Sequence, residues 1–367
     1  MAIFVSCTKT TEDKAFIKSN MFGSVYDNVI ITWVVSNKII SYTDIESGVS
    51  VPSCVQPNCT HSKKNAYCTA QIDDYAFGLI NYDNSLYILG REFIYKCDSS
   101  GSNRRIIYEI PLKTDAEYEY SSYPDTSVLY KDSKIYFVMI NNISKEVEWE
   151  YAPEHFQTVT DSTNTNSYTI HSYDFKENKG EVIYETEFYT FSHLNLMEIT
   201  ENNIFFNLSY NANTEWDLMT SDEVFKSGID IFNLNNESVS CRLNIKTGEF
   251  IEFDKHLNAV SGNYMYFIEN GEIVQFDWEN SKSEVVYAAE RAQVFDDTLF
   301  AYGEWDETYQ RCDIYFLKDK QWQKAGFDFL INFETRDYFV SMDNNSNLYA
   351  ILKSDYYAGI DTSFKIG

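Results

Sequence analysis

Three cysteines and one histidine lie within 15 residues of one another in the first fifth of this 367-residue chain. They are Cys54, Cys59, His61 and Cys68, with the spacing C-x4-C-x-H-x6-C. Three thiolates and an imidazole are ligands that fill a closed tetrahedral shell around Zn²⁺. Because the protein would supply all four ligands, no coordination position would remain for a water molecule. The spacing therefore predicts a structural zinc site rather than a catalytic one.

Two other chemistries fit the same residues. In an exported protein, Cys54 or Cys59 could form a disulfide with Cys68. Alternatively, the three cysteines could be buried reduced thiols beside an exposed histidine. Either the zinc site or the disulfide would cross-link this segment and so stabilise the long connection that contains it. The cysteines Cys97, Cys241 and Cys312 fall inside predicted strands, where a small buried hydrophobic residue is expected.

The composition excludes several classes of function. The chain has 29 Lys and Arg against 56 Asp and Glu, so its net charge is −27 and it lacks the basic surface that nucleic acids or anionic bilayers require. It is 17% aromatic with only 14 glycines, which argues against disorder and against a glycine-loop nucleotide enzyme. No His-Glu-x-x-His, Gly-x-Ser-x-Gly or phosphate-loop motif is present.

Short runs with alternating apolar residues recur along the chain, separated by turns rich in Asn, Asp, Gly and Ser. The clearest units, 84–110 and 263–287, agree in strand count, turn position and aromatic placement. Seven such units of about four strands, spaced about 50 residues apart, fit the repeat range of propellers. We therefore predict an all-β fold, a β-propeller of seven four-stranded blades, with six or eight blades as alternatives. Residues 15–367 would form this single domain, and 1–14 an N-terminal segment and linker.

The turns at 94–103 and 243–248, together with the cysteine-containing segment, resemble a known family. These stretches, including Pro57-Asn-Cys59-Thr-His61 and Cys68-Thr-Ala70, are similar to the surface lipoprotein propellers of Gram-positive anaerobic bacteria, of the domain-of-unknown-function or LDL-receptor-like type. The resemblance implies a propeller fold and an extracellular location, and implies no particular activity.

The N-terminal segment resembles the end of a bacterial lipoprotein signal, in which a small residue precedes the lipidated cysteine. Here Ser6 precedes Cys7, after only five residues where a signal needs an apolar stretch of about 7–15. Either the start of the signal is missing, or the resemblance is accidental and Cys7 is an ordinary cysteine. With a lipidated Cys7, the chain would be anchored to the outer face of the membrane and would contact the bilayer only there.

Four long insertions are expected on one face of the propeller: 54–72, 141–166, 210–237 and 304–309. Long loops on a rigid scaffold are where recognition usually resides. Aromatic side chains beside acidic ones could bind a sugar or a cationic peptide. Alternatively, they could pack on the blades and hold their own loops in place. The candidate ligand-binding residues are Trp149, Tyr151, Trp216, Trp305 and Tyr309.

These features predict a non-catalytic, cell-surface binding or scaffold lipoprotein whose ligand is a glycan, a cell-wall fragment, a peptide or a protein. A closed ring needs no partner to cover its edges, so a monomer is expected. The alternative is a propeller glycoside hydrolase that uses paired carboxylates. No motif singles out a pair among the candidate acids, which include Asp161, Glu215, Asp217, Asp222, Glu304, Asp306 and Glu307.

Overall fold

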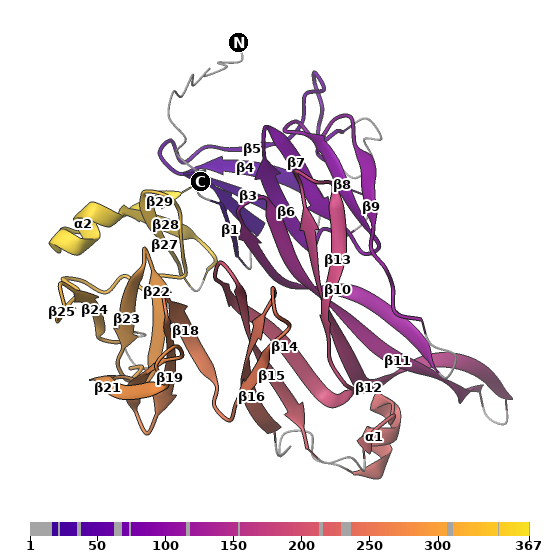
Figure 1. The fold of residues 1–367 in the computed structure, drawn as a ribbon. Helices are drawn as coiled ribbons and strands as arrows, with labels where there is room; N and C mark the ends of the chain where they lie inside the picture. The colour runs from indigo at the N-terminus through magenta and orange to yellow at the C-terminus, as the bar shows by residue number, and fades with distance from the viewer. Residues whose placement is uncertain are drawn as a thin grey trace.

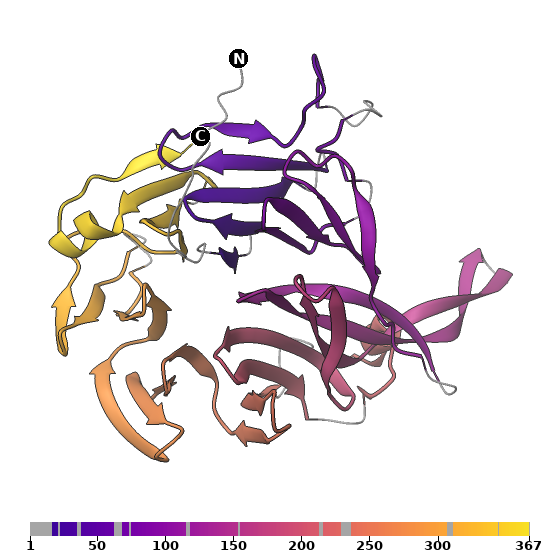
Figure 2. The ribbon, with the colours of Figure 1, turned by 45° about the horizontal axis from the view of Figure 1, so that its top comes forward.

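The computed structural model describes residues 17–20, 23–34, 38–61, 68–72, 75–114, 118–152, 155–212, 216–228, 236–306, 311–343 and 345–366. In this part of the chain, 29 strands fold into seven antiparallel blades that follow one another in chain order around a common centre (Figures 1 and 2). The prediction of an all-β, seven-bladed propeller is confirmed.

The strands of the first four blades follow the alternating runs in the sequence. Blade 1 comprises β1 (Ile17–Asn20), β2 (Gly23–Tyr26), β3 (Val29–Val34), β4 (Ile39–Asp44) and β5 (Ser50–Pro52). Blade 2 comprises β6 (Gly78–Tyr82), β7 (Ser85–Leu89), β8 (Phe93–Asp98) and β9 (Arg105–Glu109). Blade 3 comprises β10 (Glu119–Lys131), β11 (Lys134–Ala152), β12 (His155–Asp174) and β13 (Lys179–Glu185). Blade 4 comprises β14 (Tyr189–Ile199), β15 (Asn203–Asn211), β16 (Asn236–Asn244) and β17 (Phe250–Phe253).

The last three blades each have four strands. Blade 5 comprises β18 (Leu257–Ser261), β19 (Tyr264–Glu269), β20 (Glu272–Asp277) and β21 (Lys282–Ala288). Blade 6 comprises β22 (Arg291–Phe295), β23 (Thr298–Tyr302), β24 (Ile314–Lys318) and β25 (Gln321–Lys324). Blade 7 comprises β26 (Phe333–Glu334), β27 (Tyr338–Met342), β28 (Leu348–Leu352) and β29 (Phe364–Ile366).

Each seam between neighbouring blades is filled by its own cluster of buried apolar side chains. At the seam of blades 2 and 3, Leu89 and Ile94 pack with Phe137 and Met139. Equivalent clusters occupy the other six seams, including the seam between the last blade and the first. The many Tyr and Phe residues lie largely in these wide spaces, where large flat side chains fill the volume.

The ring closes without a strand shared between its ends, because β26 to β29 and β2 to β5 form separate sheets. Val25 and Ile30 of blade 1 pack with Phe333 and Val340 of blade 7. Polar contacts join the same two blades: Arg336 forms an ion pair with Asp27 at 2.5 Å, and the Asn28 side-chain amide donates to Asp337 at 2.7 Å. Closure is therefore a matter of side-chain packing supported by polar contacts.

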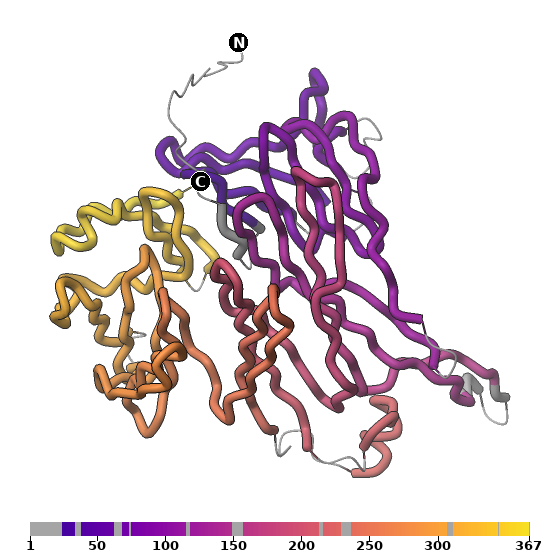
Figure 3. Tube along the Cα trace, viewed as in Figure 1, coloured from indigo at the N-terminus to yellow at the C-terminus, as the bar shows by residue number. Residues whose placement is uncertain are grey.

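One predicted loop is wrong. Residues 141–166 are not a loop, because β11 and β12 continue as paired strands through most of this range and project beyond the ring (Figures 1 and 3). Pairing between Thr165 of β12 and Thr190 of β14 joins blades 3 and 4 into one eight-stranded sheet.

The predicted insertion at 210–237 contains a short helix. Helix α1 (Ser221–Ser227) begins with a capping box in which Thr220 and Glu223 satisfy each other's backbone N–H groups, and it ends at Gly228 in a left-handed conformation. The other helix of the described residues is α2 (Lys353–Ala358), in blade 7. Neither helix has the length and apolar character needed to cross a bilayer. Cys7 lies outside the described residues, so its lipidation stays a prediction.

His171 is a buried titratable group at the seam of blades 2 and 3. It is 1% exposed and stacks on Phe137, with ring centroids 5.2 Å apart. Neither ring nitrogen has a hydrogen-bond partner among the described residues. Burial lowers the pKa of His171 to about 4, so the imidazole is neutral in the folded protein at neutral pH.

This burial predicts a pH dependence of stability. Below the unfolded-state pKa of about 6.5 the unfolded chain binds a proton that the folded chain excludes, so the free energy of unfolding falls as the pH drops from about 6.5 towards 4, by up to about 3 kcal/mol. Urea denaturation at a series of pH values should give a shallower dependence for His171→Phe than for the parent protein. The exposed His193, replaced in His193→Gln, is the control. If the free energy of unfolding of His171→Phe falls with pH as steeply as that of the parent protein, His171 is protonated without cost in the folded state.

Candidate metal centre

The structure brings the four predicted metal ligands together between β5 and β6. One donor atom from each of Cys54, Cys59, His61 and Cys68 lies within 4.8 Å of the others. The Cys68 Sγ and His61 Nδ1 atoms are 3.6 Å apart. The donors therefore form a single cluster, as the sequence spacing predicts.

A tight turn folds Cys59 back towards Cys54. The backbone N–H of Cys59 donates to the carbonyl of Gln56 at 3.3 Å, across Pro57 and Asn58. Proline is favoured at the first central position of such turns, and Asn58 has a φ of 58°, a conformation that asparagine tolerates well. After the turn, the His61 backbone N–H donates to the Cys59 Sγ at 3.4 Å. The turn residues thus place the second and third ligands.

The fourth ligand is fixed by pairing with blade 1. Beyond Cys68, the chain runs beside the start of β4: the Ile40 N–H donates to the Ala70 carbonyl at 3.0 Å, and the Ile72 N–H donates to the Lys38 carbonyl at 2.9 Å. Cys68 is 7% exposed and packs in a small apolar cluster with Ile39 and Ala70. Blade 1 therefore anchors the end of the metal-binding segment.

The same segment also contacts blade 2, at the turn between β8 and β9. The Thr69 hydroxyl donates to the Ser100 carbonyl at 3.0 Å, and the Ser53 hydroxyl donates to the Ser99 carbonyl at 2.8 Å. From blade 2, the Arg104 guanidinium donates to the carbonyls of Thr69 at 3.2 Å and Gln71 at 3.0 Å. The cluster thus lies where the first two blades meet.

The thiols of the cluster have shifted pKa values. Burial raises the pKa of Cys54, but hydrogen bonds with the Gln56 backbone and with Thr69 outweigh this effect and lower that pKa to about 6. Burial, together with hydrogen bonds to the other two thiols, raises the pKa of Cys68 to about 11. No disulfide joins any two of Cys54, Cys59 and Cys68 in the structure. Four donors arranged around one point suit a bound metal ion.

Cys97 and Cys241 are buried in strands, as predicted. The Cys97 thiol donates to the Leu86 carbonyl at 3.4 Å. Cys312 is only half-buried and precedes β24, which begins at Ile314.

Of the predicted ligand-binding aromatics, the structure describes the side chains of Trp216 and Trp305, which lie in different blades. Trp216 packs edge-to-face on Phe191 with ring centroids 6.2 Å apart, so it holds its own insertion against blade 4. Trp305, in blade 6, is 48% exposed. The side chains of Trp149 and Tyr151, and the whole of Tyr309, lie outside what the structure describes.

Some candidate acids of the hydrolase alternative lie together: Asp161 and Asp222 line one groove, and Glu304 and Asp306 line a pocket of blade 6, but the set as a whole is spread over several blades. Asp161 lies on β12 of blade 3, Asp217 accepts a hydrogen bond from Thr190 in blade 4, and Asp306 pairs through its backbone with Arg311 in blade 6. Among the described residues, no two of these three share a blade.

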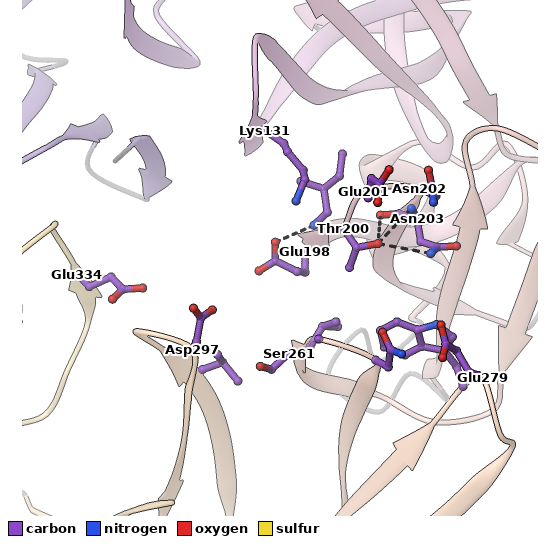
Figure 4. Close-up of a pocket in the computed structure, with 16 residues that line it drawn as sticks. Lys131, Glu198, Thr200, Glu201, Asn202, Asn203, Ser261, Glu279, Asp297 and Glu334 are labelled. Carbon is purple, nitrogen blue, oxygen red and sulfur yellow. Dashed lines mark hydrogen bonds between the residues drawn. The ribbon is translucent and has the colours of Figure 1, made fainter. Parts of the chain in front are cut away.

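Sequence reasoning missed a cavity of about 500 Å³ where the first hairpin turns of several blades meet. Figure 4 shows Lys131, Glu198, Asp297 and Glu334 around this cavity. The Glu334 carboxylate is bound by the Lys353 ammonium group at 2.8 Å. The lining is rich in carboxylates, and this cation already neutralises one of them.

A turn requirement accounts for part of the acidic lining. Asp297, which lines the cavity, occupies a hairpin turn with a φ of 54°, and the turn residues Asp132 and Asp296, which do not line it, have φ of 55° and 51°; asparagine, aspartate and glycine adopt this conformation most readily. In the sequence these residues look like ordinary turn residues. The signal that could have revealed the cavity is the recurrence of acidic turns at the same position in successive units.

Comparison with known proteins adds information on the fold alone. No protein-family model and no curated protein matches the chain. Similar solved structures include Porphyromonas gingivalis dipeptidyl peptidase 4, at 8% identity and a TM-score of 0.47, over 93% of this chain and 58% of that one. An oligogalacturonate lyase in complex with manganese matches at 9% identity and a TM-score of 0.42, over 94% and 97% of the two chains. The Pyrococcus horikoshii acylaminoacyl peptidase matches at 11% identity and a TM-score of 0.40, over 93% of this chain and 49% of the peptidase.

These matches correct the expectation of a non-catalytic binding or scaffold lipoprotein. The solved structures named above are two peptidases and a lyase, so the propeller architecture gives no reason to exclude catalysis. This chain spans only about half the length of the two peptidases. Identities this low do not transfer the activity of any of these enzymes.

The contact between Gly101 and the metal-binding segment gives a testable prediction. A Cβ atom at position 101 would lie 2.4 Å from the Thr69 carbonyl oxygen, so Gly101→Ala must push Thr69 and the adjacent Cys68 away. We expect Gly101→Ala to weaken metal binding by about tenfold and to lower the free energy of unfolding by about 1–3 kcal/mol. Metal titration and urea denaturation measure the two effects.

Gly248→Ala is the matched control. Gly248 has a φ of 72°, close to the 75° of Gly101, but a Cβ atom there would meet nothing within 4 Å. The control therefore carries the same backbone strain without the collision. Equal metal affinity in the two variants would contradict the proposed coupling between the turn of blade 2 and the metal centre.

Proposed function

We propose that this chain is a zinc-binding β-propeller in which Zn²⁺, held by Cys54, Cys59, His61 and Cys68, fastens the connection between blades 1 and 2. The observation that carries the proposal is the gathering of four donor atoms within 4.8 Å of one another. The site is a structural one, because four protein ligands complete a tetrahedral shell.

The donor set and its spacing favour zinc. Zinc–sulfur bonds of about 2.3 Å and zinc–nitrogen bonds of about 2.0 Å place neighbouring tetrahedral ligands about 3.5–3.8 Å apart. The separation of 3.6 Å between Cys68 Sγ and His61 Nδ1 falls in this range. Sulfur ligands also disfavour Mg²⁺ and Ca²⁺, which prefer oxygen.

A metal at this position would stabilise the fold in two ways. It would cross-link the 54–68 segment in the folded protein, which opposes local opening of that segment. It would also hold together residues that contact β4 of blade 1 and the β8–β9 turn of blade 2. Since such a site does not persist in an unfolded chain, the binding free energy becomes folding free energy.

Metal analysis combined with thiol counting tests the proposal. Protein purified without chelators and without added reductant should contain about one zinc ion per chain, and removal of the metal should lower the melting temperature. Thiol counting under denaturing, non-reducing conditions should find Cys54, Cys59 and Cys68 all reduced. A zinc-free protein with one or no free thiol among these three cysteines would contradict the proposal and support the disulfide.

Single substitutions localise the metal. Cys59→Ser removes one of four ligands, so its zinc content should fall well below one ion per chain, with a lower melting temperature. Cys312→Ser changes a half-buried cysteine in blade 6 and should keep both properties. Circular dichroism shows whether Cys59→Ser is folded. A folded Cys59→Ser that retains one tightly bound zinc ion would place the metal elsewhere.

A further inference from the structure

Strands β11 and β12 extend well beyond their blade. Strand β10 pairs with β11 only as far as Ser144, whereas β11 and β12 continue to pair with each other up to Ala152 and His155. We call this extension, residues 145–152 and 155–162, the arm. It projects from the ring in both views of the molecule (Figures 1 and 2).

The base of the β12 side of the arm is covered. The Asn164 N–H donates to the Met219 carbonyl at 2.9 Å, and Thr163 forms a bridge with Thr220, the residue that caps α1. On the other side, no strand of the described part of the chain pairs with the outer edge of β11 beyond Ser144. An open strand edge presents backbone N–H and C=O groups to a further strand.

A groove of about 840 Å³ lies between the arm and α1, and its lining carries five carboxylates and two lysines. Both lysines are in ion pairs, Lys145 with Glu223 at 2.7 Å and Lys226 with Asp222 at 2.5 Å. The other three carboxylates, those of Glu146, Glu148 and Asp161, have no ion-pair partner among the described residues. The groove therefore presents unneutralised negative charge beside the edge of β11 that no described strand covers.

The register of the arm places Glu146 and Glu148 on one face of the ribbon, whereas Asp161, opposite Lys145, shares the other face with the apolar positions. Glu146 and Glu148 lie opposite Thr160 and Thr158 on one face of the ribbon, and Val147 lies opposite Val159 on the other. Val147 and Val159 are half-buried, whereas Glu146 and Glu148 are exposed. Like charges on directly opposed strands repel, so this edge disfavours pairing with a second copy of itself.

We propose that the edge of β11 at 145–148 accepts a strand from a partner protein in which Lys or Arg residues alternate with apolar ones. The backbone of the added strand would extend the sheet of the arm. Its basic residues would face Glu146 and Glu148, and an apolar residue between them would pack beside Val147. This surface is separate from the metal centre and does not depend on zinc.

A peptide of alternating Lys and Val residues, with blocked ends and a fluorescent label, is the probe. Its binding is measured by fluorescence polarisation at about 0.15 M ionic strength, where nonspecific attraction to the acidic surface is screened beyond about 8 Å. The same peptide with every second backbone amide N-methylated keeps its charge but cannot form the strand ladder. We expect it to bind at least about tenfold more weakly.

Charge reversal in the protein completes the test. The double variant Glu146→Lys/Glu148→Lys should lose binding of the Lys-Val peptide by about tenfold or more and gain binding of a Glu-Val peptide. The matched control is Glu109→Lys/Glu284→Lys, which makes the same change of charge at exposed glutamates on the outer strands β9 and β21 and should bind the Lys-Val peptide as the parent does. No binding by the parent protein, equal binding of the N-methylated peptide, or equal losses in both variants would overturn the proposal.

Discussion

Every blade of this protein has two apolar faces, and only closure of the ring covers both of them. Seven seams, each with its own buried cluster, supply that cover. The last seam is the critical one because its two blades come from opposite ends of the chain and share no strand. Packing of Val25 and Ile30 on Phe333 and Val340, with the Arg336–Asp27 ion pair at the rim, therefore keeps the whole ring closed.

The candidate metal centre formed by Cys54, Cys59, His61 and Cys68 belongs to the first seam. A long connection leaves β5, makes the Pro57-Asn58 turn and returns beside β4 before it enters β6. Hydrogen bonds from Thr69 and Arg104 attach it to the turn of blade 2. These hydrogen bonds hold the backbone on both sides of the cluster, but the apolar cluster around Cys68 is small, so apolar packing around the three thiols and the imidazole is limited. Zinc would give this connection a fixed geometry that apolar packing alone does not provide.

Much of the fold could be predicted because strand alternation and turn residues are local signals. The units at 84–110 and 263–287 match β7 to β9 and β19 to β21, and the spacing of the cysteines and His61 was enough to predict the cluster. The arm was missed although Val147, Trp149 and Tyr151 alternate with glutamates as in a strand, because its other half, 157–166, is almost entirely polar and gives no matching alternation. For Trp216 the sequence left two roles open, because it does not show whether an aromatic side chain faces solvent or, as here, packs on Phe191.

Zinc K-edge X-ray absorption of the purified protein tests the central claim most directly, because it reports the ligands of the metal itself. The account predicts one shell of three sulfur atoms at about 2.3 Å and one nitrogen atom at about 2.0 Å. The number of sulfur neighbours should fall from three to two in Cys59→Ser. An absorption edge without sulfur neighbours, or no zinc edge at all in protein purified under reducing conditions, would contradict the claim that Cys54, Cys59, His61 and Cys68 hold a zinc ion between the first two blades.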